Sequence, residues 1–256
     1  MDNEFSNYVK VKDDVAMINA ANMHYRNLNS IIKTHCNPVK EIHVRKVSGQ
    51  RYIGTGLKGK VELHIYGTPG NDLAAFMDGP TVYVHGNAQD GVGNTMNSGK
   101  VVVYGHSGDI PGYSMRGGKI LIQDDVGYRA GIHMKEYEDV KPIMVIGGSA
   151  RDFLGEYMAG GIILVLGLNS QDRQYYVPKF VGTGMHGGII YTCSEITHLG
   201  KEVEVTSIDE GDMHVIEGLV KEFCSHFSCD VDRIMRKKFV KIVPLSYRPY
   251  GRLYAH

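Results

Sequence analysis

Two stretches of the sequence decide the fold: Gly93-Asn-Thr-Met96-Asn-Ser-Gly99-Lys-Val101 and, 19 residues further on, Gly112-Tyr-Ser-Met115-Arg-Gly-Gly118-Lys-Ile120. Each has a glycine three residues before a methionine, another glycine three residues after it, and then an aliphatic segment. The methionine column continues, with variations around it, at Met77, Met134, Met158 and Met185. A period near 20 residues is typical of a solenoid, whose repeats bury their apolar edges by stacking on one another.

The aliphatic segments align into columns when each repeat is set on the glycine that closes its strand. One column contains Leu63, Val82, Val101, Ile120, Ile143 and Ile163, and a second, two residues on, contains Ile65, Val84, Val103, Ile122, Val145 and Val165. Because alternate side chains of a strand point to opposite faces, these two columns should face the core. The pattern predicts an all-β fold, a single-stranded right-handed parallel β-helix with helical N- and C-terminal caps.

The alternate positions change character along the chain. Early repeats carry His64, Tyr66, Tyr83, His85 and Tyr104, whereas later repeats carry apolar residues, namely Val102, Leu121, Met144, Ile146, Leu164 and Leu166, with Gln123 as an exception. This gradient predicts that another element or another chain covers the outer face of the later coils.

Helical spacing of apolar residues predicts helices at both ends of the chain. We expect one over residues 13–34, one over 209–227, and a short one from Asp230 or Asp232 through Phe239. The expected division is an N-terminal helical cap and first strand (1–53), the β-helix of GXGXG-type repeats (54–195), and a C-terminal helical extension and tail (196–256).

Composition excludes several classes of function. The chain has 256 residues and a formal net charge of zero, so no overall field attracts nucleic acid or anionic lipid. It shows no secretory signal and no apolar run of about 18 residues, so we expect a cytoplasmic protein with no nucleic-acid or membrane partner. Four cysteines without CxxC spacing (Cys36, Cys193, Cys224 and Cys229) are expected to be reduced thiols.

Two columns could be metal ladders, but packing and turn formation explain them better. The methionines are more plausible as buried thioethers that fill a corner of each coil. Asp90, Asp109 and Asp152 also align, and stacked carboxylates repel unless they are solvated or bridged by a cation. We expect solvated aspartates that form turns through local bonds to the backbone.

Two smaller groups could carry chemistry. Asp124 and Asp125 are paired carboxylates, as in enzymes that cleave glycosidic bonds, but a solvated turn is the favoured interpretation. Cys224, His226 and Cys229 could bind an ion, although a structural zinc needs four ligands and no second pair is near in sequence. The sequence therefore predicts no catalytic, cofactor-binding or metal-binding residue in this chain.

The repeats also resemble known families. Gly155-Glu-Tyr-Met-Ala-Gly-Gly-Ile-Ile-Leu-Val-Leu-Gly167 and Val181-Gly-Thr-Gly-Met-His-Gly-Gly-Ile-Ile-Tyr191 look like the C-terminal GXGXG domain of the glutamate synthase large subunit. Gly86-Asn-Ala-Gln-Asp-Gly-Val-Gly93 and the repeats after it resemble the formylmethanofuran dehydrogenase subunit that shares that domain. The likeness extends over about residues 15 to 200 and implies a right-handed parallel β-helix without catalytic residues.

The resemblance implies a non-catalytic scaffold subunit of a glutamate-synthase-like oxidoreductase, which transfers glutamine amide nitrogen to 2-oxoglutarate in glutamate biosynthesis. Amidotransferase and FMN-barrel synthase chains would be its partners, and FMN and iron–sulfur clusters would lie on them. The alternative is a subunit like that of formylmethanofuran dehydrogenase, with molybdenum or tungsten on its partners. A stand-alone β-helix enzyme acting on carbohydrate is a third possibility, and the isolated chain could form a homo-oligomer.

Breaks in the repeat are where function is expected, because insertions in repeat proteins form loops, often on the binding face. Residues 136–141 and 169–179 are such insertions. The outer faces and both helical ends complete the list of expected sites.

Overall fold

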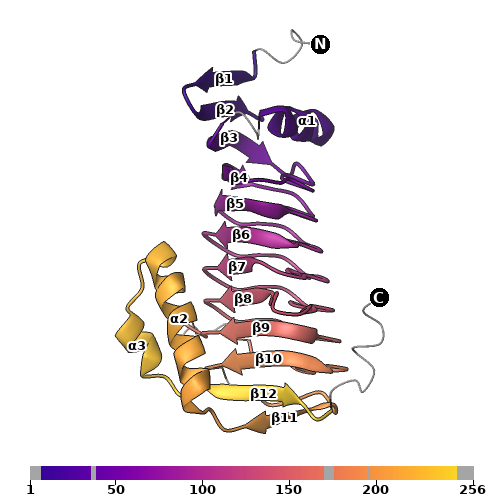
Figure 1. The fold of residues 1–256 in the computed structure, drawn as a ribbon, viewed down its shortest axis with the longest axis vertical. Coiled ribbons are helices and arrows are strands. Elements are labelled where there is room, and N and C mark those ends of the chain that lie inside the picture. The colour runs from indigo at the N-terminus through magenta and orange to yellow at the C-terminus, as the bar shows by residue number, and fades with distance from the viewer. Residues whose placement is uncertain (1–6, 36–38, 170–175, 195, 247–256) are drawn as a thin grey trace.

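The computed structural model describes residues 7–35, 39–169, 176–194 and 196–246, and it has the form of a rod of stacked coils (Figure 1). Twelve strands form one sheet in the order β1-β2-β3-β4-β5-β6-β7-β8-β9-β10-β12-β11. The first ten are β1 (Val9–Lys12), β2 (Val15–Asn19), β3 (Glu41–Ser48), β4 (Glu62–Thr68), β5 (Asp78–His85), β6 (Ser98–Val103), β7 (Lys119–Ile122), β8 (Ile143–Ile146), β9 (Ala159–Val165) and β10 (Gly187–Thr192). Strands β2 to β10 pair in parallel, each with the next along the chain, so the predicted parallel β-helix is confirmed.

The core of each coil is built from the predicted columns. In β4 and β5, Leu63 pairs with Val82 and Ile65 with Val84, and all four side chains are fully buried. The methionines fill a corner of the same core, since each of the six in the column is at most 1% exposed. They belong to the main hydrophobic cluster, so the packing interpretation of this column is confirmed.

Strand β8 departs from the predicted register by one residue. Ile120 of β7 pairs with Met144, and Ile122 pairs with Ile146. Met144 and Ile146 therefore face the core, and Val145 lies on the outer face. The prediction that Ile143 and Val145 point inward was wrong, because the strand closes at the second glycine of the Gly147-Gly148 pair: the nitrogen of Gly147 bonds to Ile122, whereas that of Gly148 bonds to Asp124.

The N-terminal segment was predicted as one helix over residues 13–34, and this prediction was wrong. Residues Val15–Asn19 form β2, which pairs with β1 and β3, and helix α1 covers only Tyr25–His35. In β2 the alternate residues Ala16 and Ile18 are buried, which is the two-residue period of a strand. The coils therefore begin before Gly54, and α1 inserts buried Leu28, Ile31 and Ile32 into the solenoid core.

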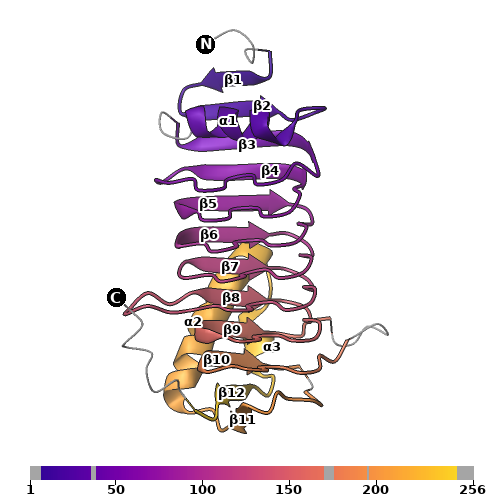
Figure 2. The ribbon, with the colours of Figure 1, turned by 90° about the vertical axis from the view of Figure 1, so that its right-hand side faces the viewer.

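The C-terminal segment contains both helices and strands. Helix α2 (Glu210–Phe227) begins at Asp209, whose carboxylate caps its first turn, and α3 (Val231–Met235) begins at Asp230. Two strands that the sequence did not predict follow the parallel stack, β11 (Val203–Thr206) and β12 (Val240–Pro244), and β12 pairs antiparallel with both β10 and β11. The sheet ends with this antiparallel pair, whose strands are connected through α2 and α3, and α2 lies along the side of the rod (Figures 1 and 2). In the described ranges no helix is both long and apolar enough to cross a bilayer.

Candidate functional site

Among the described residues, helix α2 covers the outer face of the later strands of the main sheet and not that of the earlier ones. Helix α2 packs against the later strands and forms a second hydrophobic cluster with them (Figure 1). Its fully buried members include Val102, Leu121, Val145, Leu164 and Tyr191 of the sheet and Ile216, Val220 and Phe223 of the helix. This confirms the prediction that another element covers the later coils.

Glycine makes the closest approach of α2 possible. A Cβ atom on Gly147 would lie 2.6 Å from Cζ of Phe223 and 2.0 Å from the carbonyl oxygen of Gln123. Phe223, which is fully buried, therefore packs directly over the backbone at the end of β8. The apolar outward column and this glycine together form the surface that binds the helix.

Charged groups fasten α2 to the sheet at two points. The carboxylate of Glu222 lies 2.6 Å from Nζ of Lys100 and 2.5 Å from Nζ of Lys119. Burial opposes ionisation of Glu222, but the hydrogen bonds from both lysines outweigh it, so its pKa lies below the ordinary value. The ion pairs therefore join the last turns of α2 to β6 and β7.

The second point is a buried polar group at the start of α2. Asp212 is 6% exposed and accepts hydrogen bonds from the hydroxyl of Tyr191 (2.6 Å) and from Nζ of Lys241 (2.9 Å). Burial raises the pKa of Asp212, but hydrogen bonds from the Asp209 backbone, Lys241 and Tyr191 lower it more. Burial and the bond to Asp212 raise the pKa of Tyr191. This group joins α2, β10 and β12.

Beyond the end of α2 the outer face of the sheet has no cover from the described residues. The last residues of the helix reach its boundary: the ring of Phe227 meets Tyr104 edge-on at 5.3 Å, and that of His226 lies 6.2 Å from Tyr83. Six side chains, five on β3, β4 and β5 and one directly after β6, form two stacked columns, which we call the ring ladder: His43, His64, Tyr66, Tyr83, His85 and Tyr104. Tyr83 and Tyr104 pack against the end of the α2 cluster, and beyond them the outer face is aromatic, whereas most sheet residues beneath α2 are aliphatic.

The rings of the ladder are nearly parallel. Those of His43 and His64 are 4.7 Å apart and inclined by 9°, and those of Tyr66 and His85 are 4.5 Å apart and inclined by 10°. Arg45 extends the ladder with its guanidinium 4.6 Å from the Tyr66 ring. Burial by the neighbouring rings, and then the proximity of other histidines, lowers the pKa of His64 and of His85. Both are therefore predominantly neutral at neutral pH.

The aspartate column joins one coil to the next. Oδ1 of Asp90 accepts a hydrogen bond from the backbone nitrogen of Asp109 (2.8 Å), and Oδ1 of Asp152 accepts one from Lys179 (2.8 Å). Asp109 bonds in the same way to Tyr128. The expectation of local turn bonds was wrong, because the partner of each carboxylate lies on the following coil, 19 or 27 residues ahead.

Of the paired residues Asp124 and Asp125, the second is engaged in structural hydrogen bonds. Asp125 accepts hydrogen bonds from the backbone nitrogen of Ser149 (2.7 Å) and from the amide of Asn169 (2.5 Å). Burial raises its pKa, but these bonds and the nearby His106 lower it further, so the group stays ionised. Asp125 therefore has a structural role like that of the aspartate column.

The cysteine group is also structural in character. Cys224 is buried among the residues that hold α2 on the sheet, and Cys193, Cys224 and Cys229 are free thiols, whereas Cys36 lies outside the described residues. Burial, with a hydrogen bond to Cys229, raises the pKa of Cys224 to about 12. His226 faces Tyr83 on β5, and the described residues do not bring its ring together with the two thiols as a ligand set.

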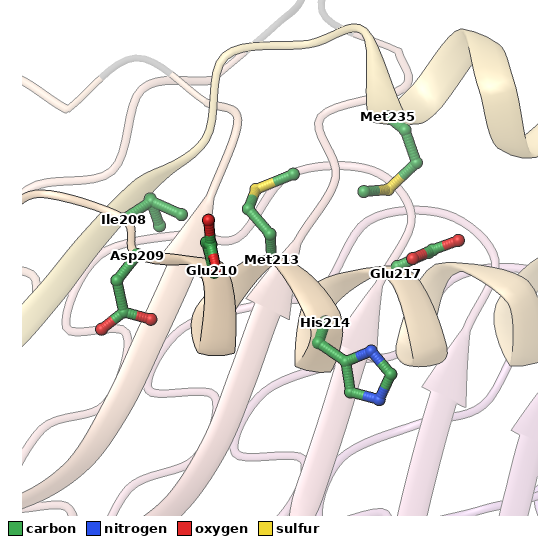
Figure 3. Close-up of a pocket in the computed structure, with 7 residues that line it drawn as sticks. All are labelled: Ile208, Asp209, Glu210, Met213, His214, Glu217 and Met235. Carbon is green, nitrogen blue, oxygen red and sulfur yellow. The ribbon is translucent and has the colours of Figure 1, made fainter.

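A pocket at the start of α2 has no catalytic arrangement among its lining residues (Figure 3). Met213 of α2 and Met235 of α3 point into the space between the helices, and His214 points away from it. Asp209 is engaged as the helix cap, and Glu217 pairs with Lys221 at 2.6 Å. The pocket is therefore an apolar gap between the helices, and two of the carboxylates at its rim, those of Asp209 and Glu217, are engaged elsewhere.

The two insertions have different surroundings. In residues 136–141, Glu136 accepts a hydrogen bond from the nitrogen of Gly161, and Tyr137 and Val140 pair as a small bridge. Of residues 169–179, positions 170–175 lie outside the described residues, and Tyr176 donates its hydroxyl to Asp152 at 2.8 Å. Neither insertion collects catalytic side chains within its described part.

The sequence did not predict one cluster. Glu41-Ile-His43 on β3 and Glu62-Leu-His64 on β4 are the same Glu-x-His pattern 21 residues apart, and they pair in register. The ligand atoms of Glu41, His43 and His64 lie within 4.8 Å of one another. The repeated pattern was visible in the sequence, but its meaning depended on β3 being a coil strand.

Comparisons with known proteins agree with this architecture. The GXGXG motif family matches residues 42–245. An uncharacterized protein of Methanocaldococcus jannaschii is 51% identical over 249 residues, which cover 93% of this chain and 95% of that protein. A solved structure, the formyltransferase/hydrolase complex of Methylorubrum extorquens with methylofuran, contains a chain that is similar with a TM-score of 0.62 and 17% identity, over 85% of this chain and 86% of that one. At that identity the likeness establishes the fold. The glycine-rich coils, the stacked methionines and the family match together show that this chain belongs to the GXGXG motif family.

Proposed function

We propose that the protein is a non-catalytic structural subunit of a multi-subunit complex that processes formyl groups, and that the ring ladder is where a partner chain docks. The observation that carries this proposal is the division of the outer face. The chain's own helix covers the mostly aliphatic part, and an aromatic part of the same sheet continues past the helix end without cover from the described residues.

Aromatic side chains support docking because they combine a large apolar surface with a polar edge, and they are enriched at protein interfaces. Tyr66, Tyr83 and Tyr104 present their rings on one flat face, and Arg45 lies at its margin. The stacking already holds these rings in place, so a partner would lose little side-chain freedom on binding.

The candidate carboxylates accept hydrogen bonds that hold the coils together, and this supports a role without catalysis. Asp125 bonds to Ser149 and Asn169, and Asp109 bonds to the following coil. The buried groups with strongly raised pKa values, Tyr191 and Cys224, lie beneath α2 and help to hold it on the sheet.

The formyl-processing assembly is favoured over the glutamate-synthase-like one. The similar solved chain is part of a formyltransferase/hydrolase complex, which fits the formylmethanofuran dehydrogenase alternative. On this proposal the cofactors lie on partner chains, with molybdenum or tungsten among them. FMN and iron–sulfur clusters with amidotransferase activity would instead mark the glutamate-synthase-like assembly.

The test is affinity purification of the tagged chain from its own organism, followed by mass spectrometry, metal analysis and FMN fluorescence. We expect formyltransferase/hydrolase-type chains to co-purify with molybdenum or tungsten, and the purified chain alone to turn over neither formyl nor carbohydrate substrates. Tyr83→Arg should release the partners, and Tyr128→Arg, at an exposed tyrosine away from the ladder, should retain them. Turnover by the single chain, or partner retention by Tyr83→Arg, would contradict the proposal.

A further inference from the structure

Strands β3 and β4 carry a grid of potential metal ligands at one end of the ring ladder. Strands β3 and β4 pair so that Glu41 lies beside Glu62 and His43 beside His64. Residues two apart on a strand share a face, so all four side chains project from the same outer surface. The sequence Glu-x-His is thus presented twice in adjacent, aligned copies.

The nitrogen atoms of the two histidines face the carboxylates. Nε2 of His43 lies 3.1 Å from Oε2 of Glu41, and Nε2 of His64 lies 3.7 Å from Oε2 of Glu62. The other ring nitrogens are engaged: Nδ1 of His43 lies 3.2 Å from the hydroxyl of Tyr66, and Nδ1 of His64 lies 3.2 Å from Nε2 of His85. Without an ion, Nε2 of His43 donates its proton to the carboxylate of Glu41. When an ion displaces that proton, the ring keeps its proton on Nδ1, toward Tyr66 or His85, and the Nε2 lone pair is free to bind the ion.

We propose that Glu41, His43, Glu62 and His64 form a binding site for a divalent transition-metal ion of the zinc class. Two imidazole nitrogens and two carboxylate oxygens are a ligand set that zinc accepts in tetrahedral geometry. Tyr66 and His85 contact the ring nitrogens on the far side from the ion, where such partners fix the orientation of metal-binding histidines. This inference does not rest on the proposed function, since the isolated chain contains the whole site.

Charge supports the assignment. Strand pairing places the carboxylates of Glu41 and Glu62 on neighbouring strands, where like charges repel. Among the ion pairs of the described residues, neither carboxylate has a lysine or arginine partner, and each has only its own histidine. A bound cation would neutralise both carboxylates at once and would link the coils of β3 and β4.

Closure onto the ion requires a modest rearrangement. An ion with bonds of about 2.1 Å separates its tetrahedral ligand atoms by about 3.4 Å, whereas those of Glu41, His43 and His64 now lie within 4.8 Å. The rings of His43 and His64 are stacked at 9°, so they must tilt toward each other as the ion binds. Because all four side chains are partly exposed at the edge of the ladder, such a tilt displaces solvent and no core residue.

The experiment is calorimetric titration of the untagged, metal-free chain with zinc chloride in a buffer that does not chelate zinc, with cobalt(II) absorption as a second readout. We expect a single zinc ion per chain, visible d–d bands of tetrahedral cobalt that zinc removes, and a rise in Tm with zinc. His43→Gln and His64→Gln should each weaken zinc binding by at least about tenfold and abolish the cobalt bands, and Tyr66→Phe should weaken it by about tenfold.

The matched control is His198→Gln, because that exposed side chain bonds only to Thr197 among the described residues. It should bind zinc as the unmodified chain does. Equal Tm values of all metal-free variants would show that they fold. Failure to bind millimolar zinc, or equal affinity and cobalt spectra in His43→Gln, His64→Gln and the control, would overturn the proposal. Zinc titration and partner capture are separate measurements, so the metal site can be refuted while the docking proposal stands, and the reverse.

Discussion

Oδ1 of Asp109 accepts a hydrogen bond from the backbone nitrogen of Tyr128, 2.8 Å away on the following coil. The carboxylate fits there because residue 127 is glycine: a Cβ atom on Gly127 would lie 2.0 Å from the same oxygen. The aspartate and the glycine of successive coils are therefore one device, in which the missing side chain makes room for the bond between coils.

This device predicts opposite effects for two glycine substitutions. Gly127→Ala should destabilise the fold by about 1 to 3 kcal/mol, because the new Cβ overlaps the carboxylate and nearby backbone. Gly218→Ala, in the middle of α2 with nothing within 4 Å of the new atom, should stabilise it by up to about 1 kcal/mol. Chemical denaturation measures both, and equal effects of the two substitutions would contradict the device.

Asp109→Ala should cost about 1 kcal/mol, the usual net contribution of such a hydrogen bond. Asp109→Asn should cost less, because its amide oxygen can still accept the bond from Tyr128. Denaturation in the presence and absence of calcium checks the alternative role of the column. If calcium raises the free energy of unfolding of the unmodified chain but not that of Asp109→Asn, the column contains a cation site.

The attachment of α2 should weaken in acid. The pKa of Glu222 is lowered from its ordinary value of 4.5, so its contribution to stability is fully present above pH 4.5 and is lost as the pH falls through the lower, folded-state pKa. The protection factors of the α2 amides, which are corrected for the intrinsic pH dependence of hydrogen exchange, should therefore fall in acid before those of the amides in the coils. Glu222→Gln should exchange faster at neutral pH and lose part of the acid dependence, whereas Glu217→Gln, at an exposed pair with Lys221, should leave both nearly unchanged.

Phe223→Ala should detach α2 locally. Removing a fully buried phenylalanine costs about 3 to 5 kcal/mol, and this side chain is the one packed over Gly147. We expect increased binding of a hydrophobic dye as Leu121 and Val145 become exposed, with far-UV dichroism of the coils retained. Complete unfolding of the rod, or no dye binding, would contradict the description of α2 as a cover added to a finished solenoid.

The methionine column should tolerate substitutions that conserve volume. Met115→Leu should change stability by less than about 1.5 kcal/mol, and Met115→Ala should cost about 2 to 5 kcal/mol, because the site is fully buried. Thermal unfolding measures both. A large loss with leucine would mean that the sulfur atom, and not the volume, matters there.

The repeat predicted most of the fold because its signals coincide at one period. Glycine, methionine and aliphatic positions recur together between Gly93 and Ile120, and a chance pattern rarely aligns all three. The apolar outward column of later coils also predicted a cover, since Leu121 and Leu164 could not stay exposed without cost. Capping residues such as Asp209 marked the start of α2 in the sequence itself.

Three other features of the structure could not be predicted from the repeat period alone. Residues Val15–Asn19 match both a helical and an alternating pattern, and only pairing with β3 selects the strand. The register of β8 was ambiguous because two adjacent glycines could close the strand, and the hydrogen bond of Gly148 to Asp124 decides between them. The Glu-x-His grid required both strands in register, so the alignment of His43 with His64 was hidden while residues 1–53 were placed outside the repeats.

The antiparallel ends of the sheet have a consequence for the size of the particle. β1 turns back on β2 at one end, and β12 turns back on β10 at the other, so neither edge repeats the parallel template that a further coil would need. Between these stops each coil adds about 4.8 Å, so the length of the rod is encoded as a whole number of repeats. The chain is in effect a ruler: any two chains bound at different coils would be held at a spacing that changes only in whole steps when a repeat is gained or lost.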